Sequence, residues 1–315
     1  MSTLVTGSIA YDTIMVFPDR FRNHLLADQL HILNVCFLTP QMRREFGGTA
    51  GNIAYNLKLL GESPLVMASV GEDSGPYIER LQHLGISTAL LKQIAGQFTA
   101  QAFITTDLDD NQITAFHPGA MNFAHENHIT RGLGARLAII APDGKEGMLQ
   151  HARECAEQAV DLMFDPGQGL PMFSAEELEG FLRLARYVAV NDYEGKLLEE
   201  RTGRKLEEIA RGVQALIYTQ GAKGSVIFAA GKRHDIPCVE AEAVVDPTGC
   251  GDAYRAGLLY GIAHGWDWPS AGKLAAVMGA IKVAQRGAQN HAPSRDEIET
   301  RFRRAFGYSP WKGSL

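Results

Sequence analysis

The sequence predicts an α/β fold, with a doubly wound, mainly parallel sheet flanked by helices and a small β-sheet lid. Four short apolar runs without in/out alternation predict strands buried on both faces; they span residues 137–141, 160–164, 187–190 and 215–219. Charged, helix-favouring stretches separate them, at residues 147–158, 175–186 and 193–212. Strands that alternate with helices in this way form a parallel sheet covered on both sides.

Two segments interrupt this alternation and predict the lid. The first contains an extended apolar run at residues 30–38, and the second reads as a hairpin of residues 99–106 and 113–117 around a polar turn. The predicted core comprises residues 1–12, 47–98 and 118–315, and the predicted lid comprises 13–46 and 99–117. Such a lid would cover the carboxyl ends of the core strands, where ligands bind in open α/β sheets. The alternative is that these strands extend the main sheet.

Composition excludes several classes of protein. The 315 residues carry a formal net charge of −6 and no Lys/Arg block longer than two, which argues against a nucleic-acid partner. No run approaches the roughly 20 apolar residues that a membrane span needs, and the first residues lack the features of a signal peptide. The four cysteines are dispersed without a CxxC pair, which argues against a zinc site or disulfides and favours the cytoplasm.

The sharpest motif is DPTGCGD at residues 246–252, followed by a helical stretch of small and apolar residues ending at Gly265. Gly249 and Gly251 permit backbone amides to approach an anion, and the positive end of the following helix points at the same place. Asp252 lies in the first turn, where a carboxylate can take a proton from an attacking hydroxyl while the amides hold the phosphoryl charge. The alternative is an ordinary capping carboxylate after a tight turn.

This motif resembles the C-terminal signature of the PfkB/ribokinase family. The stretch FGGTAGNIAYNLKLLG at residues 46–61 resembles the N-terminal signature of the same family, and the two occur in the expected order. The resemblance implies a ribokinase-like fold and an ATP-dependent kinase that uses ATP and Mg²⁺. It places the base at Asp252 and an anion hole at Gly249, Cys250, Gly251 and Asp252.

The resemblance also implies a substrate side. Asp12 ends the GSIAYD segment and resembles the family's aspartate that accepts hydrogen bonds from vicinal ribose hydroxyls. Asn52 would offer its amide to sugar hydroxyls, and Gly47 and Gly48 would let the backbone pass close to the ligand. The alternatives are a strand-end turn residue for Asp12 and a helix N-cap for Asn52.

On the nucleotide side, the NDYE segment resembles the family's N-x-x-E motif, and TQGAKG resembles its turn along the ATP phosphates and ribose. ATP binding is accordingly expected at Asn191, Glu194, Thr219, Gly221, Gly224 and Asn290. Glu194 would reach Mg²⁺ through water, since hydrated Mg²⁺ binds proteins through few direct oxygen ligands.

Relatives often hold a monovalent cation such as K⁺ near the anion hole, and Asp246 and Thr248 are the local candidates. Cys250 stands where family members commonly have Ala or Ser. Because Cys250 lies at a helix N-terminus, we predict a lowered thiol pKa and alkylation-sensitive activity.

The phosphate acceptor is predicted from a resemblance to bacterial adenosine/nucleoside-kinase-like members. It favours the 5′-hydroxyl of a nucleoside, with adenosine first and inosine or cytidine as further options. Aromatic residues of the lid, Phe37, Phe103 and Phe116, could stack on a purine, and Phe116 is taken as a substrate-binding residue. The alternative for these aromatics is packing within the lid or a dimer contact. A sugar kinase for ribose or fructose is the alternative enzyme, and a ligand-binding sensor is the non-enzymatic one. The apolar run at 30–38 would suit a homodimer formed through the lid.

Overall fold

The computed structural model describes residues 2–25, 34–109 and 111–311. In this part of the chain the main sheet has nine strands in the order β13-β12-β11-β10-β9-β8-β1-β4-β5. The strands are β1 (Thr3–Thr6), β4 (Leu65–Val70), β5 (Ser87–Gln93), β8 (Leu137–Ile140), β9 (Asp161–Phe164), β10 (Tyr187–Asn191), β11 (Ala215–Thr219), β12 (Ser225–Ala229) and β13 (Lys232–Ile236). Neighbours are parallel except β11–β12 and β12–β13. The four strands predicted from apolar runs are confirmed as β8 to β11.

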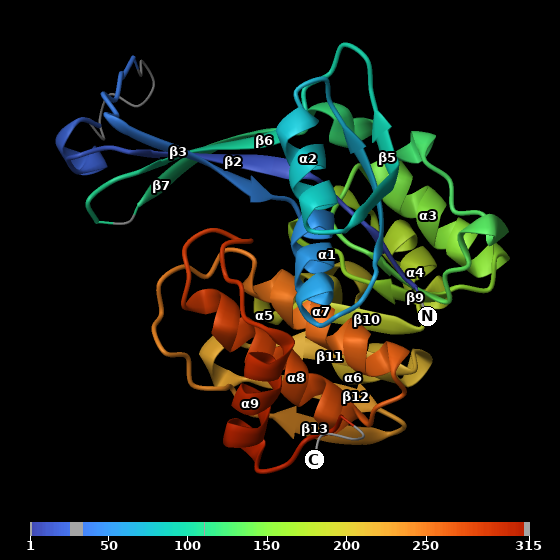
Figure 1. Cartoon of the computed structure of the whole chain (residues 1–315). Coiled ribbons are helices and arrows are strands. Elements are labelled where there is room, and N and C mark those ends of the chain that lie inside the picture. The colour runs from blue at the N-terminus through green and yellow to red at the C-terminus, as the bar shows by residue number, and fades with distance from the viewer. Residues whose placement is uncertain (1, 26–33, 110, 312–315) are drawn as a thin grey trace.

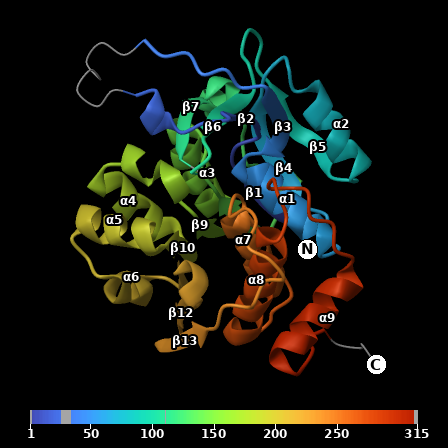
Figure 2. The ribbon, with the colours of Figure 1, turned by 90° about the vertical axis from the view of Figure 1, so that its left-hand side faces the viewer.

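Helices cover both faces of this sheet (Figure 2). One face carries α1 (Thr49–Leu59), α2 (Gly75–His83), α7 (Cys250–Ala263), α8 (Trp268–Val283) and α9 (Arg295–Phe306), and the other carries α3 (Lys145–Glu157), α4 (Ala175–Leu184), α5 (Asp192–Thr202) and α6 (Leu206–Gly212). Short 3₁₀ helices are η1 (Phe21–Asn23), η3 (Gly119–Glu126), η4 (Arg131–Leu133), η5 (Gly167–Met172) and η6 (Gly221–Lys223). No helix within the described ranges is both long and apolar enough to cross a membrane.

Two separate apolar cores follow from the pleat of the strands. Consecutive side chains of a strand point to opposite faces, so Leu4 packs in one core and Val5 in the other. The helix-favouring stretch at 193–212 forms two helices, α5 and α6. Gly203, at φ 69°, ends α5 in the left-handed conformation that favours glycine.

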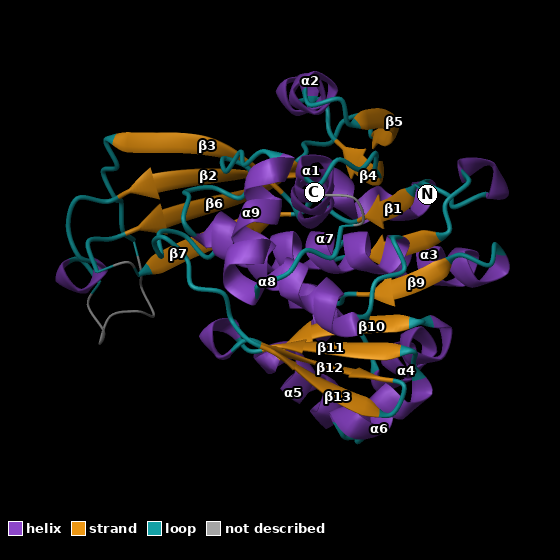
Figure 3. Ribbon diagram, turned by 60° about the horizontal axis from the view of Figure 1, so that its bottom comes forward, coloured by secondary structure: helices purple, strands orange, loops and turns teal. Residues whose placement is uncertain are grey.

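A second sheet, in the order β3-β2-β6-β7, projects from the core (Figures 1 and 3). Its strands are β2 (Ala10–Val16), β3 (Gln41–Gly47), β6 (Ala100–Thr106) and β7 (Gln112–His117). The predicted hairpin is confirmed as β6 and β7, which pair antiparallel. Because β2 begins at Ala10, residues 10–12 belong to this sheet and not to the core as predicted.

The extended run predicted at 30–38 is wrong as far as the structure describes it. Residues 34–38 form no strand, and residues 30–33 lie outside the described ranges. The strand is β3 instead, which pairs antiparallel with β2 along its whole length. As an outer strand of a small sheet, β3 is only partly buried and carries charges such as Arg43 and Arg44, so a search for apolar runs misses it.

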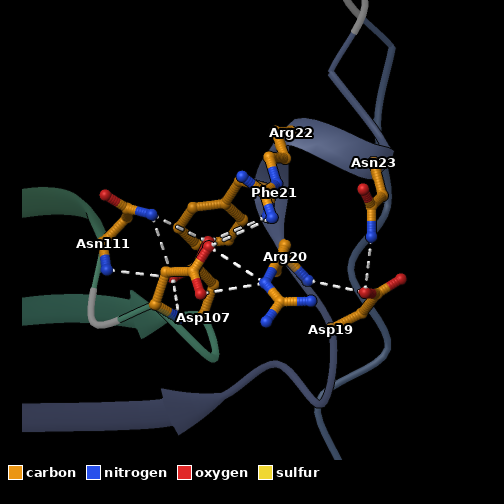
Figure 4. Close-up of polar contacts among 8 residues, drawn as sticks. Asp19, Arg20, Phe21, Arg22, Asn23, Asp107 and Asn111 are labelled. Carbon is orange, nitrogen blue, oxygen red and sulfur yellow. Dashed lines mark hydrogen bonds and ion pairs between the residues drawn. The ribbon is translucent and has the colours of Figure 1, made fainter.

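Polar contacts fasten the outer end of the second sheet (Figure 4). Asp107 is buried and accepts hydrogen bonds from the backbone amides of Phe21, Asp109 and Asn111, each at 2.9 Å. Burial alone would raise the pKa of Asp107, but these hydrogen bonds outweigh it and hold the pKa well below its usual range. Arg20 adds an ion pair to Asp109 at 2.9 Å. The segment after β2 and the β6–β7 turn are therefore joined as one unit.

Candidate active site

The second sheet leaves the core at a point where open α/β sheets bind ligands. Strand β1 lies between β8 and β4, so the strand order reverses at β1: β4 and β5 lie on one side of it, and β8 and the later strands lie on the other. The chain passes directly from the carboxyl end of β1 into β2, and β3 returns into the amino end of α1. The candidate site therefore lies where the amino ends of α1 and α7 meet beside the second sheet.

Asn52 and Asp252 come together at this place from opposite ends of the sequence. The side-chain Nδ2 of Asn52 donates to Oδ2 of Asp252 at 2.8 Å. Gln289 Nε2 donates to Oδ1 of Asn52 at 2.9 Å, and the same nitrogen lies 2.7 Å from the hydroxyl of Tyr77. The oxygen of the Asn52 amide is thus held on the Gln289 side, which turns its nitrogen toward Asp252.

The surroundings of Asp252 raise its pKa to about 7. Burial is the largest cause, because it penalises the charged carboxylate. The hydrogen bond from Asn52 and the charge of Arg255 act in the opposite direction, while Asp165 and Asp12 add repulsion. A carboxyl group with this pKa can exchange a proton near neutral pH.

Behind Asp252 lies a buried charge cluster that the sequence did not reveal. Arg255, 4% exposed, binds Asp165 through Nε and Nη2, each at 3.1 Å, and lies 3.9 Å from Glu194. A buried guanidinium without a charged partner would strongly destabilise the fold. The carboxylates of Asp165 and Glu194 provide the opposite charge that Arg255 needs. The available signal was a single arginine inside an otherwise small and apolar helix. Its main partner lies 90 positions away, which sequence spacing cannot indicate.

Asp12 faces the same space from strand β2. Its pKa is raised to about 6, first by burial and then by repulsion from Asp246 and Glu45. Gly47 makes room for it, since a Cβ added there would lie 2.5 Å from Oδ2 of Asp12. A Cβ added to Gly48 would lie 2.5 Å from Ala10 N and from Ser8 O, so the chain itself requires a glycine here. The expected close approach of Gly48 to a ligand stays a prediction.

The turn before α7 has the geometry of an anion-binding helix start. Gly249 is the N-cap with φ 78°, and a Cβ added to it would lie 2.9 Å from Cβ of Ala288. The amide of Cys250 donates to the carbonyl of Pro247 at 3.1 Å, so that amide already has an acceptor. The first amides of a helix lack intrahelical acceptors, and a Cβ added to Gly251 would meet no atom within 4 Å.

The lowered thiol pKa predicted for Cys250 is wrong. Its pKa is raised to about 11, chiefly because the thiol is partly buried. Repulsion from Asp246 and Asp252 acts in the same direction, and the charge of Lys282 only partly offsets it. Burial and two neighbouring carboxylates outweigh the helix N-terminus, so a reactive thiolate is not expected here.

Residues expected to bind ATP lie together at the carboxyl ends of β10 and β11, because Asn191 is paired with Thr219 across these two strands. Asn191 and Glu194 form a capping box at the start of α5, in which Glu194 N donates to Asn191 Oδ1 and Asn191 N donates to Glu194 Oε2, both at 2.8 Å. Thr219, Gly221 and Gly224 lie at the β11–β12 connection, where the chain doubles back through η6.

Asn290 contacts the second sheet, which carries two of the three lid aromatics. Asn290 donates to Glu45 Oε2 at 2.8 Å, which ties it to strand β3. Phe116 lies on β7 and is 52% exposed. Phe103 is exposed on β6, whereas the ring of Phe37 packs against Phe17 and Phe21 at centroid distances of 4.8 and 5.0 Å.

Across residues 2–25, 34–109 and 111–311, no three Asp, Glu, His or Cys side chains cluster in a way that could hold a metal. A magnesium ion that arrives with a nucleotide takes most of its ligands from phosphate oxygens and water. Glu194, whose carboxylate is buried beside Asp165 and Arg255, fits an ion held in that manner.

Comparison with known proteins places these features in a family. Residues 16–295 match the model described as pfkB family carbohydrate kinase. The nucleoside kinase of Methanocaldococcus jannaschii is 33% identical over 274 residues, which cover 85% of this chain and 89% of the relative. The structure of Burkholderia thailandensis nucleoside kinase in complex with inosine superposes with a TM-score of 0.89 at 53% identity, covering 98% of this chain and 99% of that one. The crystal structure of the M. jannaschii enzyme gives a TM-score of 0.88 at 30% identity, covering 96% and 99%.

Proposed function

The chain belongs to the pfkB family of carbohydrate kinases, and within that family we propose that it is a nucleoside kinase. It is thus a phosphotransferase with an alcohol acceptor and the predicted ribokinase-like fold. The proposed reaction transfers the γ-phosphoryl group of ATP to the 5′-hydroxyl of a nucleoside, with adenosine, inosine and cytidine as the candidate acceptors. The likeness to the B. thailandensis nucleoside kinase supports this class of acceptor.

The observation that carries the proposal is the contact between Asn52 and Asp252 at the amino ends of α1 and α7. Asp252, with a pKa of about 7, takes the proton of the 5′-hydroxyl as the oxygen attacks the γ-phosphorus. Asp12 accepts hydrogen bonds from the 2′- and 3′-hydroxyls of the ribose. Asn52 uses one N–H to orient Asp252 and keeps the second for the sugar.

The turn at 249–252 stabilises the transferring phosphoryl group. Because the amide of Cys250 is bonded to Pro247, the donors proposed to act are the amides of Gly249, Gly251 and Asp252. The positive end of α7 adds a favourable field at the same point. A Cβ at Gly251 would point into open space, which leaves room for the phosphoryl group.

ATP is proposed to lie along the carboxyl edge of the sheet between the β11–β12 connection and residues 276–290. Thr219, Gly221 and Gly224 would line the phosphates and ribose, and Asn290 would contribute from the other side. Magnesium bound with ATP neutralises phosphate charge, and Glu194 is the residue proposed to reach it through water. The second sheet, including Phe116, closes over the acceptor and excludes water.

Turnover of a panel of acceptors tests this proposal. We expect kcat/KM for adenosine, inosine or cytidine to exceed that for ribose and fructose by about 100-fold or more, because a base-binding site adds interactions that a free sugar cannot make. Equal or better turnover of ribose or fructose would assign the chain to the sugar kinases. Nucleoside binding without any ADP formation would instead indicate a sensor.

A further inference from the structure

A lysine lies fully buried behind the proposed anion hole. Lys282, near the end of α8, is 0% exposed. Its ammonium group donates to the carbonyl oxygen of Asp246 at 2.7 Å and to that of Gln285 at 3.0 Å. Burying an ammonium group is costly unless it is hydrogen bonded or paired, so Lys282 is an expensive residue for this position.

The ammonium lies where two loops meet. The amides of Val245 and Asp246 donate to the carbonyl of Val283 at 2.8 and 3.1 Å. The carboxylate of Asp246 returns the contact by accepting from the amide of Gly287 at 2.8 Å. The same carboxylate accepts from the amide of Thr248 at 2.9 Å, which shapes the turn that leads to Gly249. Lys282 therefore braces the backbone from which the anion-hole amides project.

Its positive charge also reaches that turn. The charge of Lys282 lowers the pKa of Cys250, although burial raises it more. Burial lowers the pKa of Lys282, while the charges of Cys250 and Asp246 oppose that shift. The ammonium thus places a positive charge behind the amides that are proposed to hold the phosphoryl group. Lys282 touches neither substrate nor nucleotide in this arrangement and acts through the turn, as a positioning residue.

The monovalent cation implied by the family does not fit beside this lysine. Carbonyl oxygens are the natural ligands of such an ion, and here the carbonyls of Asp246 and Gln285 already accept from the ammonium. Both carboxylate oxygens of Asp246 already accept backbone amides. A second positive charge next to the ammonium would be repelled by it.

We propose that Lys282 replaces the monovalent cation, so that phosphoryl transfer by this chain does not depend on K⁺. The inference rests on the proposed kinase activity for its role in catalysis. The replacement itself is a property of the loops and can be measured without turnover.

The first test compares ADP formation in tetramethylammonium chloride and in KCl at constant ionic strength. We expect the wild-type rate to agree within about twofold in the two salts, because the ammonium group of Lys282 takes the place of a bound cation. Lys282→Ala should lose at least tenfold in kcat in tetramethylammonium, with nucleoside KM largely kept. KCl or NH₄Cl should restore part of that loss, since the truncated side chain leaves room for a small cation. Lys282→Met, which fills the space without a charge, is the matched control and should not be rescued.

The second test is thermal unfolding of the same proteins in the same salts. The Tm of the wild type should be the same in KCl and tetramethylammonium chloride, and that of Lys282→Ala should rise with K⁺ or NH₄⁺. Activation of the wild type by K⁺ of fivefold or more, or a K⁺-dependent rise in its Tm, overturns the proposal. So does a folded Lys282→Ala variant with full kcat in tetramethylammonium. If the wild type forms no ADP in any salt, the proposed function fails, while the Tm comparison still tests whether Lys282 replaces the cation. If Lys282→Ala does not fold, the comparison of the wild type in the two salts tests it.

Discussion

Burial of Asp252 disfavours the ionised form of its carboxyl group, and two neighbouring residues partly offset this effect. Burial raises the pKa to about 7, against the hydrogen bond from Asn52 and the charge of Arg255. A base must be deprotonated to accept a proton, so activity should follow the ionised fraction of Asp252.

The resulting pH dependence is the first prediction. We expect kcat/KM to level off above a pH of about 7 and to fall by about tenfold per pH unit below it. Asp12, with a pKa of about 6, should make the fall steeper below that pH if its ionised form binds the ribose hydroxyls. Asp165→Asn removes a neighbouring negative charge and should move the acid limb to lower pH. A profile that is flat from pH 5.5 to 8 would contradict the role of Asp252.

A second prediction concerns Gln289, which holds the amide of Asn52 in one orientation. Gln289→Leu removes that hydrogen bond and lets the Asn52 amide turn its oxygen toward Asp252. We expect kcat to fall by about tenfold and the acid limb to shift to higher pH, because Asp252 loses a donor that favours its ionised form. Gln82→Leu, at an exposed position of α2, is the matched control and should leave both unchanged. An unshifted pH profile in Gln289→Leu would show that Gln289 has only a structural role.

Two features of individual side chains could not be predicted from the sequence: the orientation of the Asn52 amide and the pKa of Cys250. The contact of Asn52 with Asp252 agrees with the placement of two motifs, but the orientation of the amide depends on Gln289, which no motif contains. The lowered pKa predicted for Cys250 considered only the helix N-terminus. Burial and the neighbouring carboxylates, which decide the outcome, are tertiary features.

At the scale of elements, strand β3 is fitted to strand β2 by a glycine at its end. Gly47 lies beside Asp12, and a side chain there would collide with the Asp12 carboxylate. The third prediction is that Gly47→Ala raises the nucleoside KM by about tenfold or more, since a displaced carboxylate can no longer accept from both ribose hydroxyls. Gly75→Ala, where an added Cβ meets no atom within 4 Å, should leave KM unchanged. An unchanged KM in Gly47→Ala would remove Asp12 from the substrate site.

The sequence predicts correctly those strands that are buried on both faces. Strands β8 to β11 lie between two helical layers and therefore read as apolar runs. Strand β3 is a partly buried outer strand with a charged sequence, and the apolar run at 30–38 predicts it too early in the chain. The helix-favouring composition of 193–212 does not show where α5 ends, because residues on both sides of Gly203 favour helix.

In the whole molecule, two motifs about 200 residues apart meet because of the strand order. Strand β1 pairs with β4 on one side and with β8 on the other, so early and late parts of the chain lie side by side. Asn52 enters from α1 and Asp252 from α7, and these helices pack on the same face of the sheet (Figure 1). The order of the strands explains this meeting, and only the family resemblance made it predictable. The Arg255–Asp165 pair, which joins α7 to the end of β9, had no comparable signature.

The role of Asp252 as the base is tested by the activity of Asp252→Asn, measured beside the wild type with a nucleoside acceptor. Asparagine keeps the size of the side chain but cannot take the proton of the 5′-hydroxyl. We expect kcat to fall by about 10² to 10⁴ with the nucleoside affinity, measured by calorimetry, largely kept. A folded Asp252→Asn variant that retains a third or more of the wild-type kcat would contradict the claim that this carboxylate is the base.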